Sequence, residues 1–116
     1  MRGYKGFDEN LCCRGKQYEV GKNHHQNGEI RLCKNGIHFC KSLNDVFGYY
    51  SKGRYCEVEA SGTVIEGDNK CVTSDLFIIR ELSQIEVNRG RNGYGNGDGY
   101  GDGYGDIQKI LNFMEV

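Results

Sequence analysis

The sequence predicts a small α+β domain that is rich in β structure, and three observations support this prediction. Several short segments alternate apolar and polar side chains, as half-buried strands do. One segment, residues 42–50, instead spaces its apolar side chains as a helix does. The chain has 116 residues, of which 37% are hydrophobic, so it is long enough for one domain with a modest core.

The first forty residues are expected to contain short strands joined by turns and loops. Arg14-Gly15 and residues 34–36 carry turn signals, and the polar segment 22–29 is typical of a loop. The segments between them are short, and they alternate or are rich in aromatic and β-branched side chains. Strands are therefore predicted at residues 3–7, 17–20, 29–33 and 37–40.

The middle of the chain predicts one short central helix followed by longer strands. Ser42 can cap this helix, and Asp45 lies in its first turn, where a negative charge is favourable. Residues 54–60 alternate cleanly, and a second β-branched segment follows at residues 63–65. The segment 75–82 contains a continuous apolar run, Leu76-Phe77-Ile78-Ile79, which indicates a strand at the centre of a sheet.

Glycine divides the chain into three parts. There are 18 glycines and no proline, and seven of the glycines occupy every second position from Gly93 to Gly105. We therefore expect an α+β body over residues 1–89, a Gly-X tract over 90–106 and a tail over 107–116. The apolar residues of the tail recur at helical spacing, which predicts a short amphipathic helix there.

The composition disfavours several classes of protein. A formal net charge of −1 gives no general attraction to nucleic acid, and no apolar run approaches the roughly 18 residues of a membrane span. Without the apolar stretch of a signal peptide, we expect an intracellular protein whose six cysteines stay reduced. None of these cysteines has the close spacing of zinc ligands, so no metal is expected and most should be small buried hydrophobes.

The Gly-X tract is the first candidate binding segment. Its composition favours free disorder, and its charges are too sparse to mimic DNA. Tyrosine alternating with glycine suits adaptable recognition, because tyrosine offers rigid contact area while glycine lets the chain conform. The aspartates oppose phosphate, so direct binding of nucleic acid is not expected. The candidate binding residues are Tyr94, Asp98, Tyr100, Asp102 and Tyr104.

Several motifs in the body resemble an uncharacterised domain family of phages and prophage-bearing bacteria. The resemblance covers residues 3 to about 84, and it implies a phage setting rather than a particular reaction. The motifs are Tyr4-Lys5-Gly6-Phe7-Asp8, Cys13-Arg14-Gly15, Gln17-Tyr18-Glu19-Val20-Gly21, Leu32-Cys33 with Gly36-Ile37-His38-Phe39-Cys40, Asp45-Val46-Phe47 with Tyr49-Tyr50, Glu57-Val58-Glu59-Ala60 and Arg80-Glu81-Leu82-Ser83.

The order of the expected elements is also similar to that of ADP-ribosyltransferases. At the positions that match the functional residues of those enzymes, this chain has Lys5, His38 and Asp75, and none is the usual residue. Asp75 is shorter than the usual glutamate, which alone could lower the rate by about 10²-fold. The resemblance therefore implies a degenerate, inactive fold. If the resemblance is set aside, the ordinary expectation is structural: Lys5 is a solvated strand residue, His38 is a half-buried strand residue and Asp75 is a cap or turn residue.

These observations lead to the hypothesis of a small non-catalytic phage protein in the cytoplasm of the bacterial host. It would bind a host protein or ribonucleoprotein complex, for example as an anti-defence inhibitor of a CRISPR nuclease. No cofactor and no membrane contact are expected. One alternative is an ADP-ribosyltransferase that modifies a host protein with NAD through Lys5, His38 and Asp75. Another is a structural virion or assembly protein that uses the Gly-X tract.

Overall fold

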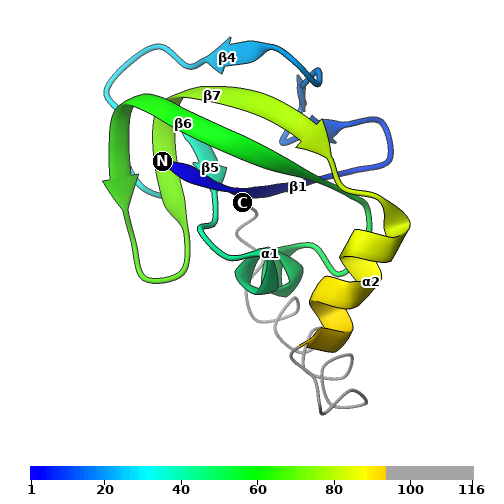
Figure 1. The fold of residues 1–116 in the computed structure, drawn as a ribbon. Coiled ribbons are helices and arrows are strands. Elements are labelled where there is room, and N and C mark those ends of the chain that lie inside the picture. The colour runs from blue at the N-terminus through cyan, green and yellow to red at the C-terminus, as the bar shows by residue number, and fades with distance from the viewer. Residues whose placement is uncertain (94–116) are drawn as a thin grey trace.

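Two long antiparallel strands, β6 (Arg54–Glu66) and β7 (Cys71–Glu81), form the centre of the fold (Figure 1). In the computed structural model, which describes residues 1–93, β1 (Arg2–Phe7) pairs with the other edge of β6. The free edge of β7 pairs with two short strands, β4 (Asn23–His25) and β5 (Ile37–Phe39). The body is therefore a β-rich α+β domain, and its central strand is β7, as the apolar run at 75–82 predicted.

Three further elements complete the described part of the chain. A small hairpin of β2 (Cys12–Cys13) and β3 (Lys16–Gln17) stands apart from the main sheet. Two helices, α1 (Leu43–Tyr49) and α2 (Gln84–Gly93), lie together at one end of that sheet (Figure 1).

The main sheet curls until its two sides nearly meet. The amide of Tyr4 on β1 donates to the carbonyl of Cys40, just after β5, at 2.7 Å, and the amide of Cys40 donates back to Tyr4 at 2.9 Å. This bridge covers part of the edge of β1, which would otherwise expose unpaired backbone groups. The strands β1, β6, β7 and β5 thus surround one core.

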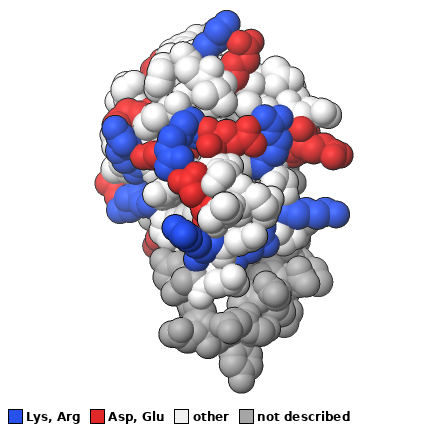
Figure 2. All heavy atoms as spheres, turned by 45° about the vertical axis from the view of Figure 1, so that its right-hand side comes forward, with Lys and Arg blue, Asp and Glu red and all other residues white. Residues whose placement is uncertain are grey.

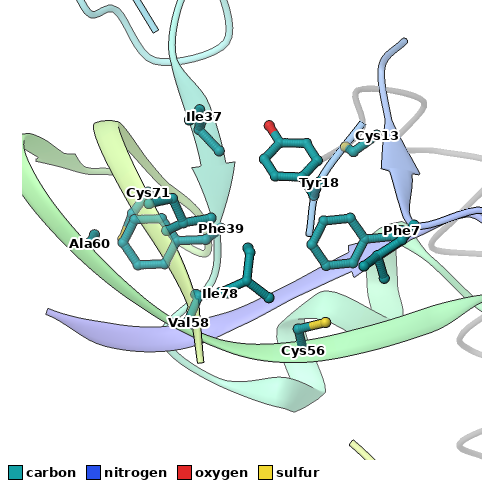
Figure 3. Close-up of a cluster of buried hydrophobic side chains, with 12 residues drawn as sticks. Phe7, Cys13, Tyr18, Ile37, Phe39, Cys56, Val58, Ala60, Cys71 and Ile78 are labelled. Carbon is teal, nitrogen blue, oxygen red and sulfur yellow. The ribbon is translucent and has the colours of Figure 1, made fainter. Parts of the chain in front are cut away.

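The inner face of this curled sheet holds the larger hydrophobic cluster (Figure 3). Phe39 from β5 and Ile78 from β7 are completely buried, and the ring of Phe7 lies 5.2 Å from that of Tyr18. Lys5 shares this inner face of β1 with Phe7, because side chains alternate along a strand. The cluster comprises Phe7, Leu11, Cys13, Tyr18, Ile37, Phe39, Cys56, Val58, Ala60, Cys71, Leu76 and Ile78.

The outer face of the sheet carries the two helices and a network of ion pairs. Phe47 of α1 packs edge-on against Tyr55 of β6 at 5.1 Å, and the guanidinium of Arg91 from α2 lies 4.6 Å from the ring of Phe47. Nearby, Glu57 accepts from Arg2 at 2.9 Å and from Arg80 at 3.0 Å. Figure 2 shows positive and negative side chains interleaved on the side that carries α2, so no patch of one sign forms there.

The structure confirms several predicted elements and corrects others. Strands β1 and β5 and helix α1 form where expected. The segment 22–29, predicted to be a loop, contains β4, because polar residues can pair with a sheet edge while their side chains face solvent. The expected strand at 29–33 is instead a turn in which Cys33 has a φ of 66°. The two strands expected at 54–60 and 63–65 are one strand, bulged near Gly62.

Only one helix was expected in the body, and helix α2 is a second one. A capping box marks its start: the amide of Glu86 donates to the hydroxyl of Ser83 at 3.2 Å, and the Glu86 carboxylate accepts from the amide of Ser83 at 2.9 Å. The helix continues to Gly93, past the boundary expected at residue 89. No described helix is long and apolar enough to cross a membrane. The tract from residue 94 and the tail helix expected at 107–116 lie outside the described residues.

Replacing Ser83 with alanine is expected to destabilise the protein by about 1 kcal/mol, because the amide of Glu86 loses its capping acceptor. Urea unfolding measures the change. The exposed Ser61 is not an N-cap and is the matched control: Ser61→Ala should shift the free energy of unfolding by less than about 0.5 kcal/mol. Equal effects of the two substitutions would show that the cap does not stabilise α2.

Candidate functional site

A cavity of about 210 Å³ lies between the β2–β3 hairpin, strand β1 and the segment that leads into β5. Four of its lining side chains are cationic, and none is a carboxylate, although the chain as a whole is close to neutral. The lining residues are Lys5, Cys13, Arg14, Lys16, Tyr18, Gln26, Lys34, Asn35, Gly36, Ile37 and His38.

Lys5 is the buried cation of this cavity. Its side chain is 1% exposed, and its Nζ donates to the carbonyl of His38 at 2.5 Å. The same Nζ lies 5.8 Å from the ring of Phe7 and 5.6 Å from the ring of Tyr18, so aromatic faces surround it. No described carboxylate forms an ion pair with Lys5, and burial lowers the pKa of its ammonium. The sequence-based expectation of a solvated strand residue is therefore wrong.

His38 contributes a second buried polar group, although it was expected to be half-buried. Its Nε2 accepts from the amide of Cys33 at 2.8 Å, so the neutral ring carries its proton on Nδ1. That Nδ1–H is buried and forms no hydrogen bond with the described residues. Burial, together with the charge of Lys5, lowers the pKa of His38 to about 4, so the ring is neutral at pH 7. His38, one of the residues that line the cavity, thus carries a buried donor that no described residue accepts from.

Arg14 and Lys34 are exposed residues at the rim of the cavity, and neither forms an ion pair with the described residues. Arg14 and Gly15 occupy the tip of the β2–β3 hairpin with φ angles of 52° and 80°. Positive φ at both central residues is the two-residue hairpin geometry that normally selects Asn-Gly. The backbone of Arg14 is therefore strained at this position. Its side chain lies at the rim of the cavity.

The backbone between the rim and β5 turns at Gly36. The φ of this glycine is 129°, and a Cβ atom on it would lie only 2.3 Å from Cγ2 of Val72. Both amide protons of Asn35 are used within the loop, by the carbonyls of Asn27 and Glu29 at 2.9 Å each. This side of the cavity is therefore held by its own backbone and amide contacts.

Asp75, the third residue expected at an ADP-ribosyltransferase-like site, does not line the cavity. Its carboxylate accepts from the hydroxyl of Ser74 at 2.8 Å and contacts Nδ1 of His25 at 2.9 Å, and these hydrogen bonds lower its pKa. Ser74 bonds to the carboxylate and not to the imidazole, so the three residues do not form a serine–histidine relay. The structure thus brings Lys5 and His38 together and places Asp75 in a separate cluster.

The remaining candidate residues give no second site in the described part of the chain. Cysteines 12, 13, 33, 40, 56 and 71 are all free thiols. Burial raises the pKa of Cys40 and of Cys56 to about 12, which keeps these thiols protonated and unreactive. Among residues 1–93, no three His, Cys, Asp or Glu side chains gather to hold a metal ion. Tyr94, Asp98, Tyr100, Asp102 and Tyr104 lie outside the described residues.

Three of the four cations were not singled out from the sequence. Arg14 and Lys34 lie at separate turns, and Lys16 follows the first turn, so no local pattern joins them. The sequence feature that could have indicated them is that each of the two predicted turns carries a basic residue, Arg14 or Lys34. Their convergence depends on how the hairpin folds over β1.

Comparison with known proteins places the body in a family. A model described as Domain of unknown function (DUF7666) matches residues 1–89. This chain is a member of the DUF7666 family. Every residue that lines the cavity belongs to the matched DUF7666 region. No curated protein and no solved structure matches the chain.

His38 is expected to make the DUF7666 domain less stable between pH 7 and pH 5. A histidine whose folded pKa lies below its ordinary value of about 6.5 gains a proton on unfolding, so the folded state loses stability as the pH falls from 6.5 towards 4. At pH 5 the loss is about 2 kcal/mol. Urea unfolding of His38→Gln should show a much smaller loss.

His24→Gln is the matched control for this pH dependence. Burial also lowers the pKa of His24, but its side chain is only partly buried, so its contribution has the same sign and should be smaller. Carboxylates with lowered pKa values, such as Glu86 at about 2, lose their contribution only below pH 4.5 and do not interfere at pH 5. An unchanged slope in His38→Gln would contradict a neutral buried His38.

Proposed function

We propose that this chain is a non-catalytic phage protein that binds an anionic group on a host protein or ribonucleoprotein through the cavity around Lys5. The observation that carries this proposal is the buried Lys5 ammonium, which has no described carboxylate partner and lies in a cavity with three further cations. A buried unpaired charge is costly. A bound anion would supply the missing counter-ion, so the cost is recovered when the partner is present.

The phage setting and the anti-defence role come from the motif resemblance, and they specify the kind of partner. A small phage protein that captures a host complex needs affinity and specificity rather than turnover. The cavity suits this task because its buried cation and its rim cations can engage one anionic group of the partner. The tyrosines at 94, 100 and 104 are proposed to widen the contact beyond the cavity.

Catalysis with NAD is the second candidate, because Lys5 and His38 both line the cavity. Two observations favour binding over this chemistry. The cavity, at about 210 Å³, is smaller than the roughly 300–1,000 Å³ of most cofactor sites, and Asp75 is engaged in its own cluster with His25 and Ser74. The virion alternative rests on the Gly-X tract, outside the described residues.

A pull-down from a bacterial host lysate tests the proposal with the full chain as bait. The double variant Arg14→Gln/Lys34→Gln removes the rim cations, and Lys52→Gln removes an exposed lysine that does not line the cavity. We expect one host complex to be retained by the wild type and by Lys52→Gln and to be lost from the double variant. Retention of the same proteins by all three baits would contradict recognition through the cavity.

The same lysate also distinguishes the proposed binding function from ADP-ribosyltransferase activity. After addition of NAD, ADP-ribosyltransferase activity would add the mass of ADP-ribose to lysate proteins, and Asp75→Ala would abolish that modification. Our proposal expects no such modification by the wild type. Modification that depends on Asp75 would replace the binding function with the enzymatic one.

A further inference from the structure

The geometry points to a phosphate monoester, entering end-on, as the anionic group that this cavity binds. The inference rests on the proposed function and adds the chemical class of the ligand. It is drawn from three features of the cavity: its charge, its unused donors and its depth.

The charge of the cavity matches a dianion better than a monoanion. Lys5, Arg14, Lys16 and Lys34 supply four formal positive charges, and no lining residue is acidic. A carboxylate would compensate one of these charges, whereas a phosphate monoester carries between one and a half and two negative charges at pH 7, by the usual second pKa of about 6. Phosphate therefore compensates more of the charge in the same space.

The unused donors can address several oxygens of one group. The Lys5 ammonium has three protons, of which the carbonyl of His38 accepts one and the side chain of Cys13 engages another, so one remains for a ligand. The Nδ1–H of His38 is buried and has no partner within the described residues. The guanidinium of Arg14 adds a fork of donors that suits phosphate oxygens. A monoester phosphate has three terminal oxygens, so it can accept from more than one of these donors.

The cavity runs from a buried floor to an exposed rim, and this depth favours a monoester over a diester. Lys5 and His38 are 1% and 2% exposed, Lys16 is half-buried, and Arg14 and Lys34 are exposed. A volume of about 210 Å³ corresponds to roughly seven water-sized groups. That space holds a phosphate and a few atoms of its carrier. A diester continues from both sides of the phosphorus and cannot reach the floor end-on.

Isothermal titration calorimetry of the full chain tests this inference. The monoester probes are inorganic phosphate, O-phosphoserine and adenosine 5′-monophosphate, and the comparison probes are dimethyl phosphate and acetate. We expect the monoesters to bind at least 10-fold more tightly than the comparison probes. A preference for phosphoserine or for the nucleotide identifies whether a phosphorylated side chain or a nucleoside carries the group. Equal binding of acetate or dimethyl phosphate would overturn the inference.

Variants connect the binding to the cavity. Arg14→Gln should weaken phosphate binding roughly 10- to 100-fold, as expected for loss of a charge-assisted hydrogen bond, whereas Lys52→Gln should change it less than twofold. Arg14 is exposed at a hairpin tip, so the variant should fold, and circular dichroism checks this. Equal affinities of folded Arg14→Gln and wild type would overturn the inference. If no monoester binds while host capture still depends on Arg14 and Lys34, the ligand class is wrong and the proposed function stands.

Discussion

Lys5→Met is expected to stabilise the fold and to abolish anion binding. Methionine fills nearly the same volume without a charge, so the variant removes a buried ammonium that no described carboxylate compensates. We expect a gain of about 1–3 kcal/mol in the free energy of unfolding at pH 7, by analogy with buried charges replaced by apolar side chains. Phosphate affinity should fall by more than about 50-fold, because the cation at the floor is lost.

The pH dependence separates this explanation from a simple improvement in packing. When the pKa of a lysine is lower in the folded state than in the unfolded state, the lysine reduces the free energy of unfolding. This reduction is complete below the folded pKa, and it becomes smaller as the pH rises towards the ordinary value of about 10.4. The advantage of Lys5→Met over the wild type, measured by urea unfolding, should therefore shrink between pH 7 and pH 10. Lys52→Met, at an exposed position, serves as the control. A variant less stable than the wild type by more than 1 kcal/mol would contradict a costly unpaired Lys5.

Gly36→Ala is expected to cause the largest loss of stability among these substitutions, about 3 kcal/mol or more, from a strained backbone and an overpacked core. The φ of 129° is one that residues with a Cβ rarely adopt, and the new Cβ would lie 2.3 Å from Cγ2 of Val72 and 3.2 Å from the carbonyl oxygen of Thr73. Both neighbours belong to the central strand β7, which cannot easily move. Thermal and urea unfolding measure the loss.

Gly21→Ala is the matched control for Gly36→Ala. Gly21 has a φ of 83°, but nothing lies within 4 Å of the position that its Cβ would occupy. This substitution therefore reports the cost of backbone conformation alone, about 1 kcal/mol. Equal losses for the two variants would show that β5 can shift away from β7, and the rigid wall assigned to the cavity would then be wrong.

The sequence predicted the elements whose stability depends on their own side chains. The run from Leu76 to Ile79 predicted the central strand, and its residues Leu76 and Ile78 are completely buried in the core, although Phe77 on the other face is exposed. The spacing of Leu43, Val46 and Phe47 predicted α1, which packs its apolar side against the sheet. In both cases the local pattern and the tertiary packing require the same residues.

The sequence did not predict the elements whose stability depends on distant partners. Strand β4 is polar, and it is a strand because β7 offers a free edge to its backbone. Helix α2 has a capping box at Ser83 and Glu86, but its sequence is mostly polar and runs into the glycine-rich tract, so the apolar periodicity that predicts a helix is weak there. A single sequence gives no measure of which edges remain unpaired.

The candidate site was predicted in part. Lys5 and His38 were identified by resemblance, and the structure places both at one cavity. Their burial was not predicted. Lys5 is on the inner face of β1, and the ring of His38 is on the face of β5 opposite Ile37 and Phe39, where it bonds to the amide of Cys33 in the preceding turn. Arg14 and Lys34 join them only through the fold of two turns, at separations of 9 and 4 residues from Lys5 and His38 respectively.

Arg14→Asn provides the most direct test of the central claim, which is that the cavity binds an anion through cations that lower the stability of the fold. Asparagine tolerates the positive φ at the hairpin tip, so the variant should be more stable than the wild type by about 0.5–1 kcal/mol. The lost guanidinium should at the same time weaken phosphate binding by at least 10-fold. Urea unfolding and calorimetry on the same full-length sample measure both quantities. Opposite changes in stability and affinity are the predicted result, and an Arg14→Asn variant that binds phosphate as tightly as the wild type would contradict the account.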